Sequence, residues 1–257
     1  YCRACVRDTS ACRREGVQVC RNSIFTKRWV KGSAVLVATA ATLVFANPQQ
    51  AIATPLKGVD SATVSQSASN VVDIDFADGI KGRITFLEDG IFRYNVDPKG
   101  EFSEYATPRS KSHTAKIQAQ PDTSDTYSKP SATVADKGDT IEITGGKATV
   151  ILDKSTGKMS IKSGDRGVVS ESAPLDLDKK GTVQTLAKEK SENFFGGGTQ
   201  NGRFLHTNQT IAISNTNNWT DGGVASPNPF YWTSDGYGVL RNTFAEGSYD
   251  FGSTDSS

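Results

Sequence analysis

Short segments in which apolar and polar residues alternate recur along this chain from about residue 70. Because successive side chains of a strand point to opposite faces, this alternation predicts strands with one buried face. Turn residues such as Asp78-Gly79 and Asp97-Pro98-Lys99-Gly100 close several of the segments. The predicted strands are Val71–Phe76, Arg83–Leu87, Ile91–Val96, Thr140–Thr144, Ala148–Leu152 and Lys158–Lys162, with weaker candidates at Val168–Ser170 and Thr182–Leu186.

The spacing of these segments indicates the fold class. Strands that recur at intervals of roughly 8–12 residues are typical of β-sandwiches and barrels. No stretch carries a convincing pattern for a long amphipathic helix. We therefore predict an all-β, antiparallel domain over residues 70–257, after a polar linker at 54–69. Residues 103–131 are polar and are expected to form loops, with one short strand candidate at Lys116–Gln118.

The segment from 27 to 53 has the pattern of an export signal. A basic stretch, Lys27-Arg28-Trp29-Val30-Lys31, precedes an apolar run from Gly32 to Ala46, and Ala51-Ile52-Ala53 supplies small residues for cleavage. An apolar run of about 15 residues suits a signal-peptide helix but is short for a stable membrane span. The sequence predicts a secreted or cell-surface bacterial protein whose mature chain starts at Thr54; the alternative is a buried helix.

Residues 1–26 differ from the rest of the chain. They hold all four cysteines, Cys2, Cys5, Cys12 and Cys20, and no histidine lies nearer than His113. We interpret residues 1–26 as an unstructured segment upstream of the true start; the alternative is a zinc site. The remainder has no cysteine, which excludes a disulfide framework and a cysteine nucleophile there.

The charge distribution argues against nucleic acid as a partner. The whole chain has 29 Lys and Arg against 28 Asp and Glu, but eight of the basic residues and only two of the acidic ones lie within residues 1–53. The body is therefore mildly acidic, whereas a nucleic-acid-binding domain shows a basic face. No membrane association is expected after removal of the signal peptide.

Aromatic residues are concentrated in the last quarter of the chain. Residues 193–252 hold 11 of the 22 Phe, Tyr and Trp residues and ten of the 24 glycines. Aromatic rings pack against the apolar faces of sugar rings, and Asn, Asp and Gln bind the hydroxyl groups, so this composition suits a carbohydrate site. Composition alone fits a sandwich core with tight turns at least as well.

The order of motifs in this region is more specific than its composition. Five segments follow one another in it: Phe194–Phe204, Asn217–Asp221, Asn228–Trp232, Asp235–Thr243 and Tyr249–Gly252. This series resembles the N-terminal β-sandwich of glycoside hydrolase family 31, the family of α-glucosidases and α-xylosidases, which has a galactose-mutarotase-like shape. In that family an F-G-G/E loop, a variable loop, an N-x-P-F/Y strand and a G-Y-G-V-x-x-N-T hairpin recur in this order. The resemblance is strong over about 193–252, extends less specifically to about residue 70, and is greatest to secreted bacterial members that act on surface or mucin-type sugars.

The resemblance implies a retaining α-glycosidase that needs no cofactor or metal. In the family one Asp attacks the anomeric carbon and a second acts as acid and then base, and both lie on a (β/α)₈ barrel that follows the sandwich. Such a barrel needs about 250 residues of its own. We therefore expect the catalytic carboxylates beyond this chain, no catalytic residue within it, and no activity from the chain alone.

The resemblance also implies where this domain would contact an α-linked oligosaccharide. In the family a loop of the sandwich reaches over the mouth of the barrel, and by position it corresponds to about 214–228. Trp219 is the candidate stacking platform and Asp221 the candidate acceptor for a hydroxyl group, while Asn228 and Phe230 are candidates for the rim. The alternative is a loop held by local Asx turns around one core tryptophan.

Three other functions were compared with this hypothesis. A mutarotase needs an acid–base pair, usually His and Glu, and only His113 and His206 are available. A phosphate-binding loop at Gly196–Gly198 would need the G-K-[ST] ending and a following helix, which the sequence lacks, so we expect these glycines to permit positive φ angles instead. A stand-alone carbohydrate-binding or adhesion module is the main alternative to the glycosidase.

Overall fold

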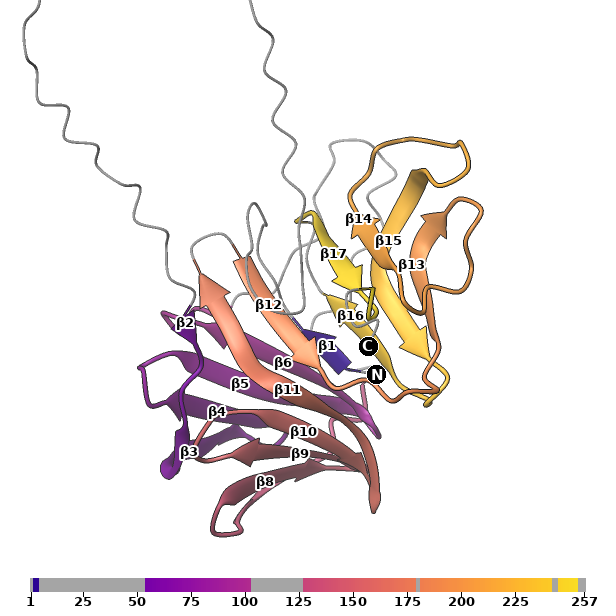
Figure 1. The fold of residues 1–257 in the computed structure, drawn as a ribbon. Coiled ribbons are helices and arrows are strands. Elements are labelled where there is room, and N and C mark those ends of the chain that lie inside the picture. The colour runs from indigo at the N-terminus through magenta and orange to yellow at the C-terminus, as the bar shows by residue number, and fades with distance from the viewer. Residues whose placement is uncertain (1, 5–53, 103–126, 179–180, 242–244, 254–257) are drawn as a thin grey trace, which may run out of the picture.

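The computed structural model describes residues 2–4, 54–102, 127–178, 181–241 and 245–253. Every regular element within these residues is a β-strand, and the strands form two large sheets and one small sheet (Figure 1). Almost all strand pairs are antiparallel. The prediction of an all-β antiparallel sandwich is therefore confirmed. In the part of the chain that is described, no helix is long and apolar enough to span a membrane.

The first sheet contains eight strands in the order β13-β15-β16-β1-β6-β5-β4-β3. Its strands lie far apart in the sequence, so the aromatic C-terminal region joins the same sheet as the first hairpins (Figure 1). The strands are β3 (Val59–Ala68), β4 (Val71–Phe76), β5 (Lys81–Glu88), β6 (Ile91–Asp97), β1 (Cys2–Ala4), β16 (Gly238–Arg241), β15 (Val224–Thr233) and β13 (Phe194–Gln200).

The second sheet contains seven strands: six follow the order β12-β11-β10-β9-β8-β7, and the short β2 pairs with β11. These strands are β12 (Gly181–Leu186), β11 (Arg166–Asp178), β10 (Met159–Ser163), β9 (Ala148–Asp153), β8 (Thr140–Gly145), β7 (Ala132–Asp136) and β2 (Thr54–Pro55). A small third sheet pairs β14 (Thr210–Ile213) with β17 (Gly247–Asp250) beside β15.

Two boundaries predicted from the sequence need correction. The segment 54–69 is not a linker, because it forms β2 and most of it is β3, an edge strand that pairs with β4. Its many Ser, Thr and Ala residues give little contrast between apolar and polar positions in the sequence, yet Val59 and Val64 of this strand pack toward the core. The segment 1–26 is not wholly unstructured, because Cys2–Ala4 form β1 between β6 and β16, where this extended backbone pairs in parallel with both neighbours. The predicted signal peptide, the strand candidate Lys116–Gln118 and His113 lie outside the described residues.

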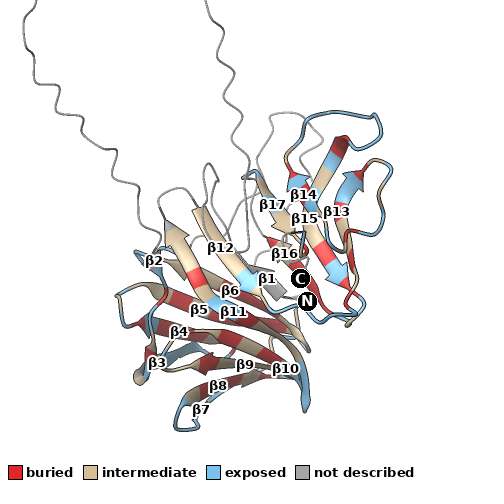
Figure 2. Ribbon diagram, viewed as in Figure 1, coloured by how far each residue is buried: buried red, intermediate tan, exposed pale blue. Residues whose placement is uncertain are grey.

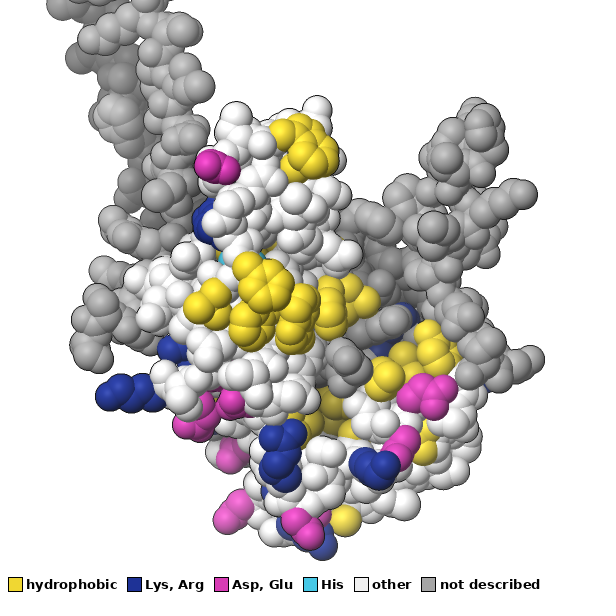
Figure 3. All heavy atoms as spheres, turned by 90° about the vertical axis from the view of Figure 1, so that its right-hand side faces the viewer, with side chains coloured by type: hydrophobic (Ala, Val, Ile, Leu, Met, Phe, Trp, Pro, Cys, Tyr) yellow, Lys and Arg dark blue, Asp and Glu magenta, His cyan; other side chains and the backbone are white. Residues whose placement is uncertain are grey.

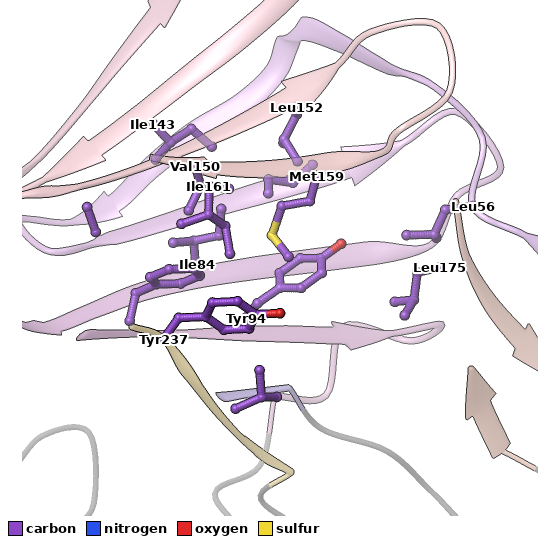
Figure 4. Close-up of a cluster of buried hydrophobic side chains, with 14 of the residues drawn as sticks. Leu56, Ile84, Tyr94, Ile143, Val150, Leu152, Met159, Ile161, Leu175 and Tyr237 are labelled. Carbon is purple, nitrogen blue, oxygen red and sulfur yellow. The ribbon is translucent and has the colours of Figure 1, made fainter. Parts of the chain in front are cut away.

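The core lies between the two large sheets and is made by the buried apolar side chains that alternate along the strands of both (Figure 2). Ile84 and Tyr94 from the first sheet and Val150 and Met159 from the second are among the side chains that fill this layer (Figure 4). Packing is close: a β-carbon added at Gly145 would lie 2.3 Å from the ring of Phe86. The alternation seen in the sequence therefore defines the buried face of both sheets.

Candidate functional site

The loop of residues 214–223, which joins β14 to β15, carries the two main candidate residues. Trp219 is 69% exposed, and its indole Nε1 donates a hydrogen bond to Asn217 Oδ1 at 2.9 Å. The core alternative for this tryptophan is therefore wrong. The aromatic residues of this region that are buried in the core are instead Phe194, Tyr231 and Phe251, which pack on one another.

Local Asx turns hold the loop, as the alternative interpretation expected. Asn215 Oδ1 accepts a hydrogen bond from the backbone N–H of Asn217 at 3.1 Å. Asn218 Oδ1 accepts from the backbone N–H of Thr220 at 3.1 Å and from its hydroxyl at 2.7 Å. Short amide side chains bind their own backbone in this way and tolerate a positive φ, which Asn217 adopts at 48°.

A second layer of contacts fixes the loop to the turn after β13. The Asn201 side-chain amide donates to the carbonyl oxygens of Asn218 at 2.9 Å and Thr220 at 3.1 Å. The guanidinium of Arg203 donates to the carbonyl oxygen of Gly222 at 2.9 Å. These residues were not predicted from the sequence. Because the contacts use backbone groups of the loop, the side chains of Trp219 and Asp221 remain outside this network.

Asp221 lies two residues after Trp219 and is exposed. A β-carbon added at Gly202 would lie 3.5 Å from its Oδ1, so the carboxylate sits against the glycine turn after β13. Among the described residues, no side chain forms an ion pair or hydrogen bond with Asp221. The loop therefore presents an indole ring and an unpaired carboxylate two residues apart.

Asn228 and Phe230 lie on β15 and do not join this pair. Asn228 is exposed, whereas Phe230 is half-buried and stacks on Trp232 with ring centroids 6.1 Å apart. At about 3.3 Å per residue, Phe230 lies roughly 20 Å along the strand from its first residue, Val224. The structure thus brings Trp219 and Asp221 together and separates both from Phe230.

The glycine cluster permits a close approach between strands. Gly196, Gly197 and Gly198 have φ values of 111°, 73° and 77°, as expected from the sequence. A β-carbon at Gly198 would lie 2.3 Å from the carbonyl oxygen of Ser226 in β15. The pairing register shifts between Gly196 and Gly198, where two steps along β13 face four steps along β15, so the glycine cluster lies opposite a bulge in β15.

His206 has the environment of a core residue. It is 1% exposed, its Nε2 lies 3.0 Å from the carbonyl oxygen of Gly196, and its ring stacks on Phe251. Within the described residues no carboxylate forms a hydrogen bond with it. The acid–base pair of a mutarotase is therefore not assembled around His206. The described residues also contain no cluster of three or more His, Cys, Asp or Glu that would hold a metal ion.

Comparison with known proteins identifies the family. A family model described as the glycosyl hydrolase 31 N-terminal galactose mutarotase-like domain matches residues 81–250. The chain therefore belongs to this domain family of the glycosyl hydrolase 31 enzymes. No curated protein sequence matches the chain significantly.

Solved structures, among them two family 31 enzymes, share the fold. A family 31 dextranase from Flavobacterium johnsoniae, complexed with glucose, superposes with a TM-score of 0.64 at 16% identity, over 78% of this chain and 24% of that one. An α-xylosidase from Xanthomonas citri gives 0.52 at 21% identity, over 71% and 19%. A cycloalternan-forming enzyme from Listeria monocytogenes, in complex with a pentasaccharide substrate, gives 0.56 at 15% identity, over 72% and 17%. The chain thus spans about a quarter of the dextranase and less of the other two.

Proposed function

We propose that this chain is the N-terminal domain of a secreted α-glycosidase and that its 214–223 loop contacts the α-linked oligosaccharide substrate. Hydrolysis itself would proceed by a retaining double displacement on two carboxylates of a catalytic domain in the same polypeptide. The observation that carries the proposal is the exposed indole of Trp219, held on a loop that hydrogen bonds fix from two sides.

The chemistry of the loop suits a sugar. When the apolar C–H face of a pyranose packs on an exposed indole ring, apolar surface is removed from water, which stabilises the complex. Asp221 adds an ionised acceptor two residues away, and a hydrogen bond from a sugar hydroxyl to a carboxylate is worth roughly 1.5–3 kcal/mol. Because the loop is already ordered, little conformational entropy is lost when a ligand binds.

Two further points support the parts of the proposal that concern substrate and export. The similar structures include the dextranase complexed with isomaltotriose, the α-xylosidase, and the cycloalternan-forming enzyme in complex with a pentasaccharide substrate. The basic stretch Lys27–Lys31, the apolar run Gly32–Ala46 and the small residues Ala51-Ile52-Ala53 support export with cleavage before Thr54, the first residue of β2. We propose that the exported protein begins with this strand.

The test uses the full-length enzyme that carries this domain. We expect Trp219→Ala to lower kcat/KM for an α-linked oligosaccharide such as isomaltotriose by about 5- to 30-fold, and Asp221→Asn to lower it by about 10-fold or more. Val134→Ala is the control, because Val134 is also an exposed apolar side chain but lies on β7 in the other sheet. Melting temperatures of all three variants should stay within a few degrees of the wild type.

The outcomes separate the two functions considered. Unchanged kcat/KM for both loop variants would contradict the contact with substrate. If the full-length polypeptide binds the oligosaccharide through Trp219 but hydrolyses no α-glycoside, the protein is a carbohydrate-binding module rather than a glycosidase. The 257-residue chain by itself should bind weakly and show no turnover of aryl α-glycosides.

A further inference from the structure

A continuous row of aromatic rings lies on the outer face of β13 and β15. Phe204 packs on Phe195 with ring centroids 5.4 Å apart, Phe195 stacks on Trp232 at 5.9 Å, and Trp232 stacks on Phe230 at 6.1 Å. We call these four residues the aromatic stripe. Phe204 is 72% exposed and Trp232 40% exposed, and Leu205 beside them is 46% exposed. A hydrophobic patch is visible on this side of the domain (Figure 3).

The stripe gives this half of the sheet two apolar faces. Phe194 and Tyr231 point inward and are buried in the core, while their neighbours Phe195, Phe230 and Trp232 point the opposite way. Strands that are apolar on both faces are typical of sheets covered on both sides. Exposed apolar patches of more than a few hundred Å² are uncommon on monomers and usually mark an interaction surface.

The geometry of the rings favours a protein partner over a sugar. The planes of Phe195 and Trp232 are 22° apart and those of Phe230 and Trp232 are 26° apart, at separations too short for rings lying side by side in one plane. The rings are therefore stacked with an offset, and each covers part of its neighbour's face. A sugar platform needs a ring face that is not covered by other rings: Trp219 offers one at 69% exposure, whereas Phe195, Trp232 and Phe230 cover part of one another's faces.

We infer that the aromatic stripe is the surface on which the catalytic domain of the same polypeptide packs. This inference rests on the proposed function, because that function supplies the partner. The domain occurs in relatives as about a quarter of a longer chain, so a large partner is covalently attached there. An interface between domains of one chain buries roughly 600–1,500 Å², and the stripe would form its apolar centre.

The placement of the stripe fits this partner. β15 carries Phe230 and Trp232, and the Trp219 loop leads directly into its first residue. Phe251, just beyond β17, packs on Tyr231 of the same strand with ring centroids 5.1 Å apart. Chain that continues past β17 therefore starts beside β15. A partner docked on the stripe lies on the same half of the domain as the loop that we propose to contact its substrate.

Hydroxyl-radical footprinting of the full-length enzyme and of the 257-residue chain tests this inference. We expect Phe204 and Trp232 to be oxidised at least fivefold more slowly in the full-length enzyme than in the chain. Trp219 is the matched control: without sugar it should react at a similar rate in both proteins, and only added oligosaccharide should protect it. Phe204→Ser removes a ring that is mostly exposed, so it should fold, and in the full-length enzyme it should restore the reactivity of Trp232.

Three results would overturn the inference: equal oxidation of Phe204 and Trp232 in both proteins, protection in the chain alone that disappears on dilution, or protection of the stripe by oligosaccharide. The second would assign the stripe to a second copy of the chain, and the third to a sugar. Protection of the stripe with no effect of sugar on Trp219 would support domain docking and contradict the proposed substrate contact. The two proposals therefore fail separately.

Discussion

Substitution of Gly198 by alanine tests why glycines cluster in β13. At Gly198 a β-carbon would lie 2.3 Å from the carbonyl oxygen of Ser226 and 2.5 Å from the backbone nitrogen of Asn228. Both atoms belong to the backbone of β15, so no side-chain rotation relieves the clash. We expect the two strands to separate locally, with loss of pairing at the bulge.

Gly90→Ala is the matched control. Gly90 has a φ of 87°, close to the 77° of Gly198, and nothing lies within 4 Å of an added β-carbon. Both variants therefore carry the strain of a left-handed backbone, which costs roughly 1–2 kcal/mol. Only Gly198→Ala adds the clash, and overpacking of this kind costs about 1–3 kcal/mol more.

Urea unfolding of the 257-residue chain, followed by tryptophan fluorescence, measures the difference. Gly198→Ala should lose about 2–5 kcal/mol and Gly90→Ala about 1–2 kcal/mol. In a domain of this size each kcal/mol corresponds to roughly 2–4 °C in melting temperature. An equal loss in both variants would refute the reasoning, because positive φ alone would then explain the glycine at position 198.

Three more predictions concern the loop, pH and export. Asn201→Ala removes two hydrogen bonds worth about 1 kcal/mol each, so amide exchange should accelerate in residues 217–223 and stay unchanged in β8 and β9; equal exchange would contradict the anchor. Burial raises the pKa of Glu171 from its ordinary value, so the stability that its protonated form provides at low pH is lost as the pH rises through the folded pKa; wild type should therefore lose stability relative to Glu171→Gln as the pH rises above that ordinary value, and a difference in unfolding free energy that does not change with pH would refute this. N-terminal sequencing of the exported protein should begin at Thr54, and a mature chain that retains 32–46 would exclude cleavage there.

Much of the sandwich was predictable from local patterns. The segment Val71–Phe76 was predicted with the bounds that β4 has, and seven more predicted segments match strands to within a few residues or lie inside them. Alternation works here because each sheet buries one face against the other. β3 was missed because its Ser, Thr and Ala residues give little apolar contrast, although Val59 and Val64 pack inward.

The candidate site was predictable only in part. Trp219 and Asp221 were singled out from their place in a series of motifs, and the structure brings them together on one exposed loop. The anchoring by Asn201 was not predicted. Its side chain bonds to Asn218 and Thr220, which lie 17 and 19 residues later in the sequence, and no periodic pattern of residues marks such a contact. The separation of Phe230 from the loop follows from the direction of β15, and the exposure of Phe204 from the packing around it; neither is encoded locally.

The central claim is that this domain places Trp219 against the substrate of an α-glycosidase. The most direct measurement is a crystal structure of the full-length enzyme with an α-linked oligosaccharide bound. The account predicts a sugar ring packed face to face on the Trp219 indole, with carbon atoms about 4 Å apart, and a sugar hydroxyl within hydrogen-bonding distance of Asp221. A bound oligosaccharide that contacts neither residue, with the 214–223 loop turned away from the catalytic domain, would contradict it.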